Sequence, residues 1–293
     1  MERRVSLLRS LVGCACGALA SCAPVGQELS PAAGGTYVTD SVTGIGFLRV
    51  PGGEFTMGLT EGSANEQPPH RVRLKSFLIA RTEVTVRQFA KFVQDTGRQT
   101  DAEKYGSARV WDGNDWVNLP GASWRHPAEA CADDCPVSYL SWNDAAAFCA
   151  WAKMRLPTDA EWEYAAGAGG EHLHWAGTSH DWELQDYAWF RLNSGRQLHP
   201  VAQKKPNSFG LYDMSGNVGE WCADWYGQGY YAESPSDDPQ GPSTGTSRVL
   251  RGGNAHNDAT RVRVTYRGMQ LADFAHAAIG FRPVRDLPTP DER

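Results

Sequence analysis

Two carboxylates around one turn have the residue types and spacing of a cation site. Asp213 and Glu220 are seven residues apart and flank the turn Ser215-Gly216-Asn217. Hard cations prefer carboxylate oxygens supplemented by backbone carbonyls. The pattern therefore predicts a bound cation, although a capped turn without an ion has the same sequence features.

Cysteine is the second residue type here whose side chain could take part in chemistry. Cys131 and Cys135 flank Ala-Asp-Asp in a loop, and this spacing predicts a small disulfide. A metal site would need two more ligands near by, and the sequence offers none in order. Cys149 and Cys222 stand among aromatic residues, which favours buried thiols or a second disulfide over nucleophiles.

The remaining candidates for reactive groups have weaker patterns. Glu161 and Glu163 are two positions apart in an expected helix, so they do not share a face and do not form an acid–base pair. His256, Met269 and His276 can ligate metals, but their spacing does not make them converge. No catalytic residue is predicted.

Composition excludes several classes of protein. The chain has 293 residues, of which 41% are hydrophobic and 21% charged, so it can build a packed core. The net charge of −6 and the lack of any run of five basic residues argue against a nucleic-acid partner. The 31 Gly, 17 Pro and 11 Trp indicate a loop-rich domain rather than a helix bundle.

The N-terminus has the pattern of an export signal. Residues 1–10 are basic, residues 11–20 are apolar and small, and Leu19-Ala20-Ser21-Cys22 resembles a bacterial lipobox. We expect a signal peptide over 1–21, acylation of Cys22, and a protein anchored by lipid in the bacterial envelope, at the outer membrane or in the periplasm. An ordinary cleaved signal is the alternative. The Pro-, Gly-, Ser- and Ala-rich residues 22–44 predict a flexible tether.

One domain is expected over residues 45–286, followed by a tail over 287–293. Capping boxes predict three helices, because a side chain at each start can satisfy free backbone N–H groups. These boxes are Thr85–Gln88, Ser141–Asp144 and Thr158–Glu161. The other predicted elements are a hairpin over 45–57 and strands over 70–80, 248–251, 261–267 and 279–284. In the strand over 261–267, Arg261 and Arg263 would face solvent. The fold class is α+β.

Several segments, in this order, resemble the formylglycine-generating enzyme (sulfatase-modifying factor) family. They are Gly53–Gly58, Glu83–Thr85, Pro136–Val137, Ser141–Ala145, Arg155–Ala166, Pro206–Met214, Gly216–Trp221, Arg251–Gly253 and Gly280–Arg282. The resemblance implies a C-type-lectin-like domain with a few helices and short mixed sheets. It also implies that the turn after Asp213 is similar to a structural calcium site. The ligands would be the side chains of Asp213 and Glu220 and the carbonyls of Gly216 and Val218.

Two cysteines that the resemblance leads one to expect are missing. Family members that make formylglycine resemble copper oxidases with two cysteines between the Arg-Gly-Gly and Gly-Phe-Arg motifs, and two thiolates suit copper(I). Here residues 254–279 contain no cysteine, and none follows Cys222. We therefore expect neither copper nor formylglycine-generating activity.

Three functions stay open. The first is a catalytically silent binding or accessory protein with a protein or small-molecule ligand. The second is a ligand-binding variable protein of a diversity-generating retroelement, with its variable region at about 254–278. The third is an enzyme of unrecognised chemistry, such as periplasmic tailoring of a small molecule. In both binding hypotheses the contact residues are Asn254, His256, Asn257, Asp258, Asp273 and His276.

Overall fold

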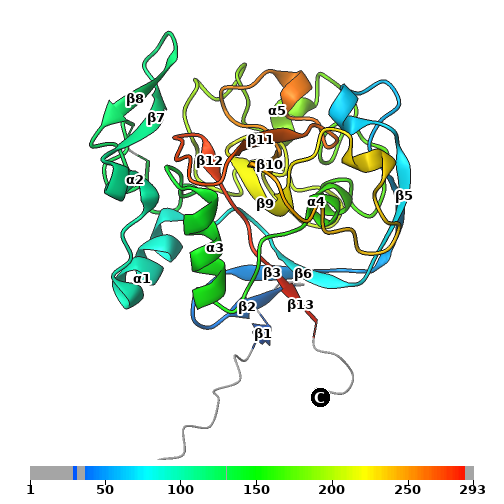
Figure 1. The fold of residues 1–293 in the computed structure, drawn as a ribbon, viewed down its shortest axis with the longest axis horizontal. Coiled ribbons are helices and arrows are strands. Elements are labelled where there is room, and N and C mark those ends of the chain that lie inside the picture. Colours follow the sequence, from blue (N-terminus) through cyan, green and yellow to red (C-terminus); the bar gives the residue numbers. More distant parts are fainter. Residues whose placement is uncertain (1–28, 32–36, 130, 288–293) are drawn as a thin grey trace, which may run out of the picture.

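The computed structural model describes residues 29–31, 37–129 and 131–287. Its first sheet is antiparallel and brings the two ends of this region together (Figure 1). The strand order is β1 (Leu29–Pro31), β2 (Val38–Asp40), β3 (Gly46–Val50), β6 (Phe77–Ala80) and β13 (Val284–Asp286). Strands β1 and β2 fall within the segment predicted to be a tether, so part of that segment is paired with the domain.

A second sheet lies on the other side of the molecule and carries the family motifs near the C-terminus. Its order is β11 (Gly268–Leu271), β10 (Ser247–Arg251), β9 (Gly219–Trp225) and β12 (Ile279–Gly280), and β12 is parallel to β9. Two separate hairpins complete the strands. They are β4 (Gly53–Met57) with β5 (His70–Leu74), and β7 (Ser107–Trp111) with β8 (Trp116–Pro120).

The three predicted helices are present: α1 (Val86–Thr96), α3 (Trp142–Trp151) and α4 (Asp159–Ala166). Each begins with the capping box that its sequence predicts, so the free N–H groups of the first turn are satisfied locally. Two short helices, α2 (Asp101–Tyr105) and α5 (Leu184–Tyr187), were not predicted. Three 3₁₀ turns complete the helical elements: η1 (Ala64–Glu66), η2 (Tyr230–Ala232) and η3 (Ala259–Arg261). The α+β class is confirmed.

Two strand predictions were wrong about pairing. The residues over 45–57 do not form a hairpin, because β3 pairs with β6 while β4 pairs with β5. At this corner the chain passes close to its neighbour, and a Cβ on Gly52 would meet the carbonyl oxygen of Leu74 at 2.7 Å. The run over 70–80 is likewise two strands, β5 and β6, in different sheets.

The strand predicted over 261–267 is also wrong, because distant carboxylates bind two of its three arginines; Arg261 is exposed, as predicted. Arg263 does not face solvent but donates to both oxygens of the buried Glu66. Arg267 is buried and pairs with Asp159. The segment instead follows η3 as a loop, and these ion pairs hold it against η1 and α4.

Two apolar clusters form most of the core. Aromatic rings of α1 and α3 dominate the first, in which Phe89, Phe92 and Phe148 pack together and Phe148 also contacts Phe281. The second lies among α4, the β4–β5 hairpin and the second sheet, with Trp162 and Val249 fully buried. Within the described residues, no helix combines the length and apolar character needed to cross a bilayer.

Candidate functional site

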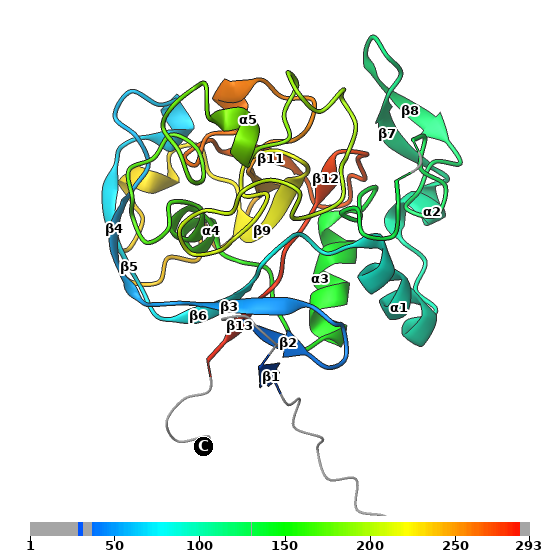
Figure 2. The same ribbon diagram turned by 180° about the vertical axis from the view of Figure 1, so that it is seen from behind.

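Residues 254–278 form one surface together with the β7–β8 hairpin, which is far away in sequence. Backbone hydrogen bonds join the two segments, from Arg109 N–H to the Ala275 carbonyl at 3.0 Å and from Ala277 N–H to the Arg109 carbonyl at 2.8 Å. Both views of the fold show the hairpin standing beside β11 and β12 (Figures 1 and 2). The hairpin therefore supplies one wall of any site on this surface.

A wall of rings, packed at tilted and edge-on angles, forms part of this surface. The ring of Trp116 lies 4.1 Å from that of His276 and 4.8 Å from that of His256, measured between centroids. Trp111 packs against Trp116 at 5.6 Å, and the guanidinium of Arg196 lies 4.8 Å from the Trp111 ring. Trp111 and His256 line one pocket, while Trp116 and His276 line another.

Both histidines of the wall are neutral at physiological pH. Burial, with smaller contributions from His256 and Arg109, lowers the pKa of His276 to about 3. Burial and Arg196 lower the pKa of His256 to about 4. The Nδ1 atom of His276 accepts a hydrogen bond from Ala278 N–H, so its proton resides on Nε2. Both imidazoles are therefore uncharged, and His276 accepts a hydrogen bond, whereas the buried Nδ1 of His256 has no partner within the described residues.

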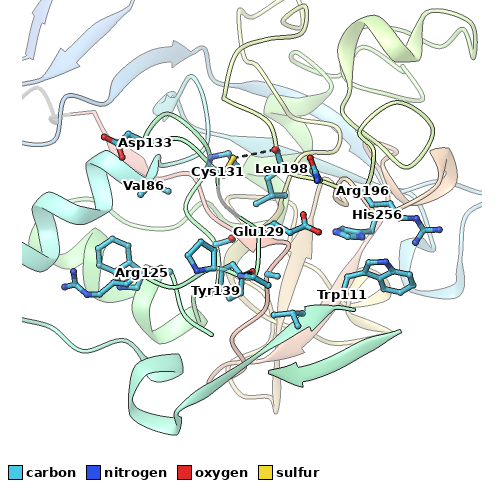
Figure 3. A pocket seen from close by; sticks show the side chains of 18 of the residues that line it. Val86, Trp111, Arg125, Glu129, Cys131, Asp133, Tyr139, Arg196, Leu198 and His256 are labelled. Carbon is cyan, nitrogen blue, oxygen red and sulfur yellow. Dashed lines mark hydrogen bonds between the residues drawn. The ribbon is translucent and has the colours of Figure 1, made fainter. Parts of the chain in front are cut away.

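The first pocket has a volume of about 430 Å³ and mixes apolar and charged groups. Figure 3 shows Trp111, Arg196, His256 and Glu129 gathered toward one end and Arg125 toward the other. Burial raises the pKa of Glu129, and no hydrogen bond of its side chain occurs within the described residues. The Cys131–Cys135 disulfide borders this pocket through Cys131, whose Sγ contacts the Leu198 carbonyl.

The second pocket, of about 220 Å³, lies between the wall and the second sheet. Asn254, Asn257 and His276 from the predicted set line it, while His256 lines the first pocket. Asp258 instead caps η3 by accepting from Thr260.

Asp273 is exposed and lines neither pocket. The prediction missed Trp111, Trp116, Arg196 and Arg261. The signal that could have revealed the two tryptophans is their place on either side of the turn Asp112–Asp115.

The free cysteines of the described region line neither pocket of this surface. Cys149 on α3 and Cys222 on β9 are buried thiols, and they do not form a second disulfide with each other. Burial raises the pKa of both thiols. Among the residues that the structure describes, none of the possible metal ligands His, Cys, Asp and Glu form a group of three suited to an ion. His256 and His276 thus have no third such ligand.

The predicted cation turn shows a partial fit to calcium. Glu220 is already occupied, because Arg282 donates to both of its oxygens and Trp162 Nε1 donates to one. Asp213 accepts from Ala202 N–H through Oδ2, whereas its buried Oδ1 has no partner in the described region. Both oxygens of the buried Glu83 also lack partners there. Burial and Asp213 raise the pKa of Glu83, and burial raises that of Asp213 to about 6.

The short sheets, few helices and long loops define a C-type-lectin-like α+β domain. A model of the sulfatase-modifying factor enzyme 1-like domain matches residues 36–287, so the chain belongs to this family of formylglycine-generating enzyme homologues. It is 41% identical over 289 aligned residues to a formylglycine-generating enzyme of Streptomyces coelicolor, covering 82% of this chain and 89% of the relative.

Two solved structures are similar over most of the chain. PvdO from Pseudomonas aeruginosa has a TM-score of 0.73 and 25% identity, with coverage of 86% of this chain and 98% of that one. The Treponema denticola variable protein 1 has a TM-score of 0.69 and 27% identity, with coverage of 85% and 98%. The family and the C-type-lectin-like fold implied by the sequence motifs are confirmed.

Proposed function

We propose that this protein is a catalytically silent member of its family that binds a ligand on the surface formed by residues 254–278 and the β7–β8 hairpin. The observation that carries the proposal is the distribution of thiols. No cysteine follows Cys222, and the two free thiols of the described region are buried and protonated. Copper(I) chemistry at this surface would need thiolates that this arrangement does not supply.

Loss of catalysis is tested by incubating the full chain with copper and a cysteine-containing sulfatase peptide. Mass spectrometry should detect no aldehyde product, while the Streptomyces coelicolor enzyme in the same assay should convert the peptide. Conversion by this chain would contradict the proposal.

Ligand binding is tested with a variant that fills the second pocket. Met269 lines this pocket and is 55% exposed, so Met269→Trp adds bulk without removing a polar contact. Leu192→Trp is the matched control, because Leu192 is 81% exposed and lines neither pocket of this surface. Immobilised full chain should retain a ligand from extracts of the source organism, as should Leu192→Trp, whereas Met269→Trp should lose it. Equal retention by all three proteins would reject this surface.

A second candidate is a variable protein of a diversity-generating retroelement. The similarity to the Treponema denticola variable protein 1 over 85% of the chain favours it. Deep sequencing of codons 248–286 across isolates should then show substitutions concentrated at 254–260 and 271–278. The buried Ala255, Ala275 and Ala278 should stay constant, because their side chains have no room to vary. A uniform segment would exclude this candidate.

Two further proposals concern anchoring and calcium. We propose that Cys22 is acylated and ties the protein to the envelope; this residue lies outside the described region. We also propose that calcium binds beside Asp213, where the unpartnered Asp213 and Glu83 oxygens support an ion. Because Glu220 is held by Arg282, its contribution to such a site would be limited to the lone pairs that Arg282 and Trp162 leave free.

A further inference from the structure

Several polar side chains of the second pocket are oriented so that their N–H groups are free to donate. Asn254 uses its Oδ1 atom to accept from His256 N–H at 3.0 Å, and Asn257 uses its Oδ1 to accept from Asn254 N–H at 3.1 Å. Because a backbone N–H can donate only to the oxygen of an amide, these bonds determine how both amides are oriented. The Nδ2 donors of Asn254 and Asn257 have no partner in the described region.

The same relationship recurs at two other residues of the pocket. Gln270 accepts from Leu271 N–H through Oε1 at 3.0 Å, which leaves its Nε2 group as a donor. His276 accepts from Ala278 N–H through Nδ1, which leaves Nε2–H as a donor. Four separate side chains of this pocket thus bind neighbouring backbone through an acceptor atom and keep their N–H groups free to donate.

The charged residues of the second pocket also favour a ligand that accepts hydrogen bonds. Arg261 lines the pocket and forms no ion pair within the described residues, and the lining contains no aspartate or glutamate. The other lining arginine, Arg251, is fully buried and neutralised by Asp159 and Glu163. The side chain of Asp258 hydrogen-bonds to Thr260 and does not line the pocket. The hydrogen bond from Thr260 lowers the pKa of Asp258, and the nearby Arg191 and Arg261 lower it further.

From this geometry we infer that the second pocket recognises an anionic, acceptor-rich group, namely a carboxylate, sulfate or phosphate ester of a small molecule. Its oxygens would accept from the amide groups of Asn254, Asn257 and Gln270 and pair with the Arg261 guanidinium. This inference rests on the proposed function and names the ligand class of that surface. It also assigns a role to the loop hydrogen bonds, which orient the donors before the ligand arrives.

The test uses the full chain in detergent, titrated calorimetrically with sodium sulfate, sodium phosphate and sodium malonate at constant ionic strength. Ethylammonium chloride is the cationic probe. We expect saturable binding of at least one anion and none of ethylammonium, and the ranking of the three anions identifies the preferred group. Absence of saturable binding by all three anions, or binding of ethylammonium in their place, would overturn the inference.

Two substitutions reverse the chemistry while preserving the loop. Asn257→Asp and Gln270→Glu keep the oxygen that accepts from backbone N–H but replace the donor by a negatively charged acceptor. Each should weaken anion binding by roughly tenfold or more, as should Arg261→Gln, because a charge-assisted hydrogen bond is lost or reversed. Asn118→Asp is the matched control. Asn118 is exposed on β8, so this substitution adds the same negative charge outside the pocket.

Unchanged affinity in Asn257→Asp, or an equal loss in Asn118→Asp, would mean that the anion binds elsewhere or responds only to net charge, and would overturn the inference. The two proposals fail separately. If Met269→Trp loses the extract ligand while no anion binds to the wild-type chain, the binding function stands and the anionic ligand class is wrong. If an anion binds as expected but no extract ligand is retained, the ligand class stands and the cellular role is wrong.

Discussion

Arg282 and Glu220 form a doubly hydrogen-bonded ion pair inside the protein. Arg282 Nε donates to Glu220 Oε2 at 2.7 Å and Nη2 donates to Oε1 at 2.6 Å, and both side chains have 0% exposure. The same guanidinium donates to the carbonyls of Ala80 and Tyr212, so one side chain joins the first sheet, the Asp213 turn and β9. The Gly-Phe-Arg motif thus has a structural explanation.

Arg282→Met should destabilise the protein strongly. The substitution leaves the Glu220 carboxylate buried without its cation, a change that typically costs about 3–5 kcal/mol of unfolding free energy. Urea denaturation followed by circular dichroism measures the loss. The double variant Arg282→Met with Glu220→Gln removes the buried charge as well and should recover part of it. A single variant as stable as the wild type would show that the pair contributes nothing.

Calcium should raise the thermal unfolding midpoint of the full chain, because an ion that binds only the folded state stabilises it by mass action. At a hundredfold excess over Kd the stabilisation would be about 2.7 kcal/mol. Asp213→Asn should abolish the shift while keeping the backbone, since asparagine tolerates the left-handed conformation at this position (φ 57°). Asp237→Asn, at an exposed ion pair with Arg73, is the control and should respond like the wild type. An unfolding midpoint that calcium leaves unchanged would contradict this site.

Acid should destabilise the wild-type protein through His276. In the folded protein its pKa of about 3 lies below the ordinary value of 6.5. Below pH 6.5 this histidine is therefore protonated in the unfolded chain but stays neutral in the folded chain. Stability from this group is complete above pH 6.5 and falls by roughly 1 kcal/mol per pH unit between about pH 6 and pH 3. His276→Asn keeps an acceptor for Ala278 N–H without titrating. Unfolding free energies of the two proteins should therefore diverge as the pH falls, and parallel curves would contradict this assignment.

Replacement of Cys22 by alanine should release the protein from the membrane fraction. The lipobox pattern at 19–22 predicts that this cysteine carries the lipid. Cell fractionation and immunoblotting compare the variant with the wild type, and Cys16→Ala serves as a control within the predicted signal peptide. A variant that stays in the membrane fraction would disprove lipid attachment at this residue.

Local sequence predicted those elements whose stabilising contacts are local. Thr85, Ser141 and Thr158 begin helices because the acceptor and donor of each capping box lie three residues apart. Strand pairing was predicted poorly, because partners such as β3 and β6 are far apart in sequence. The alternation over 261–267 resembles a strand, but Glu66 and Asp159 bind Arg263 and Arg267 from nearly 200 and about 100 residues away.

The amino-acid sequence by itself determines which chemistry is absent. No fold can supply a thiolate to residues 254–279 from their own sequence, because they contain no cysteine. Only the tertiary structure decides what the surface presents instead. Asparagine, glutamine and neutral histidine each carry both donor and acceptor, and the backbone N–H groups beside them determine which remains free. The β7–β8 hairpin then adds Trp116 to the wall, where it packs against His276. This contact was not predicted because the two residues are far apart in the sequence.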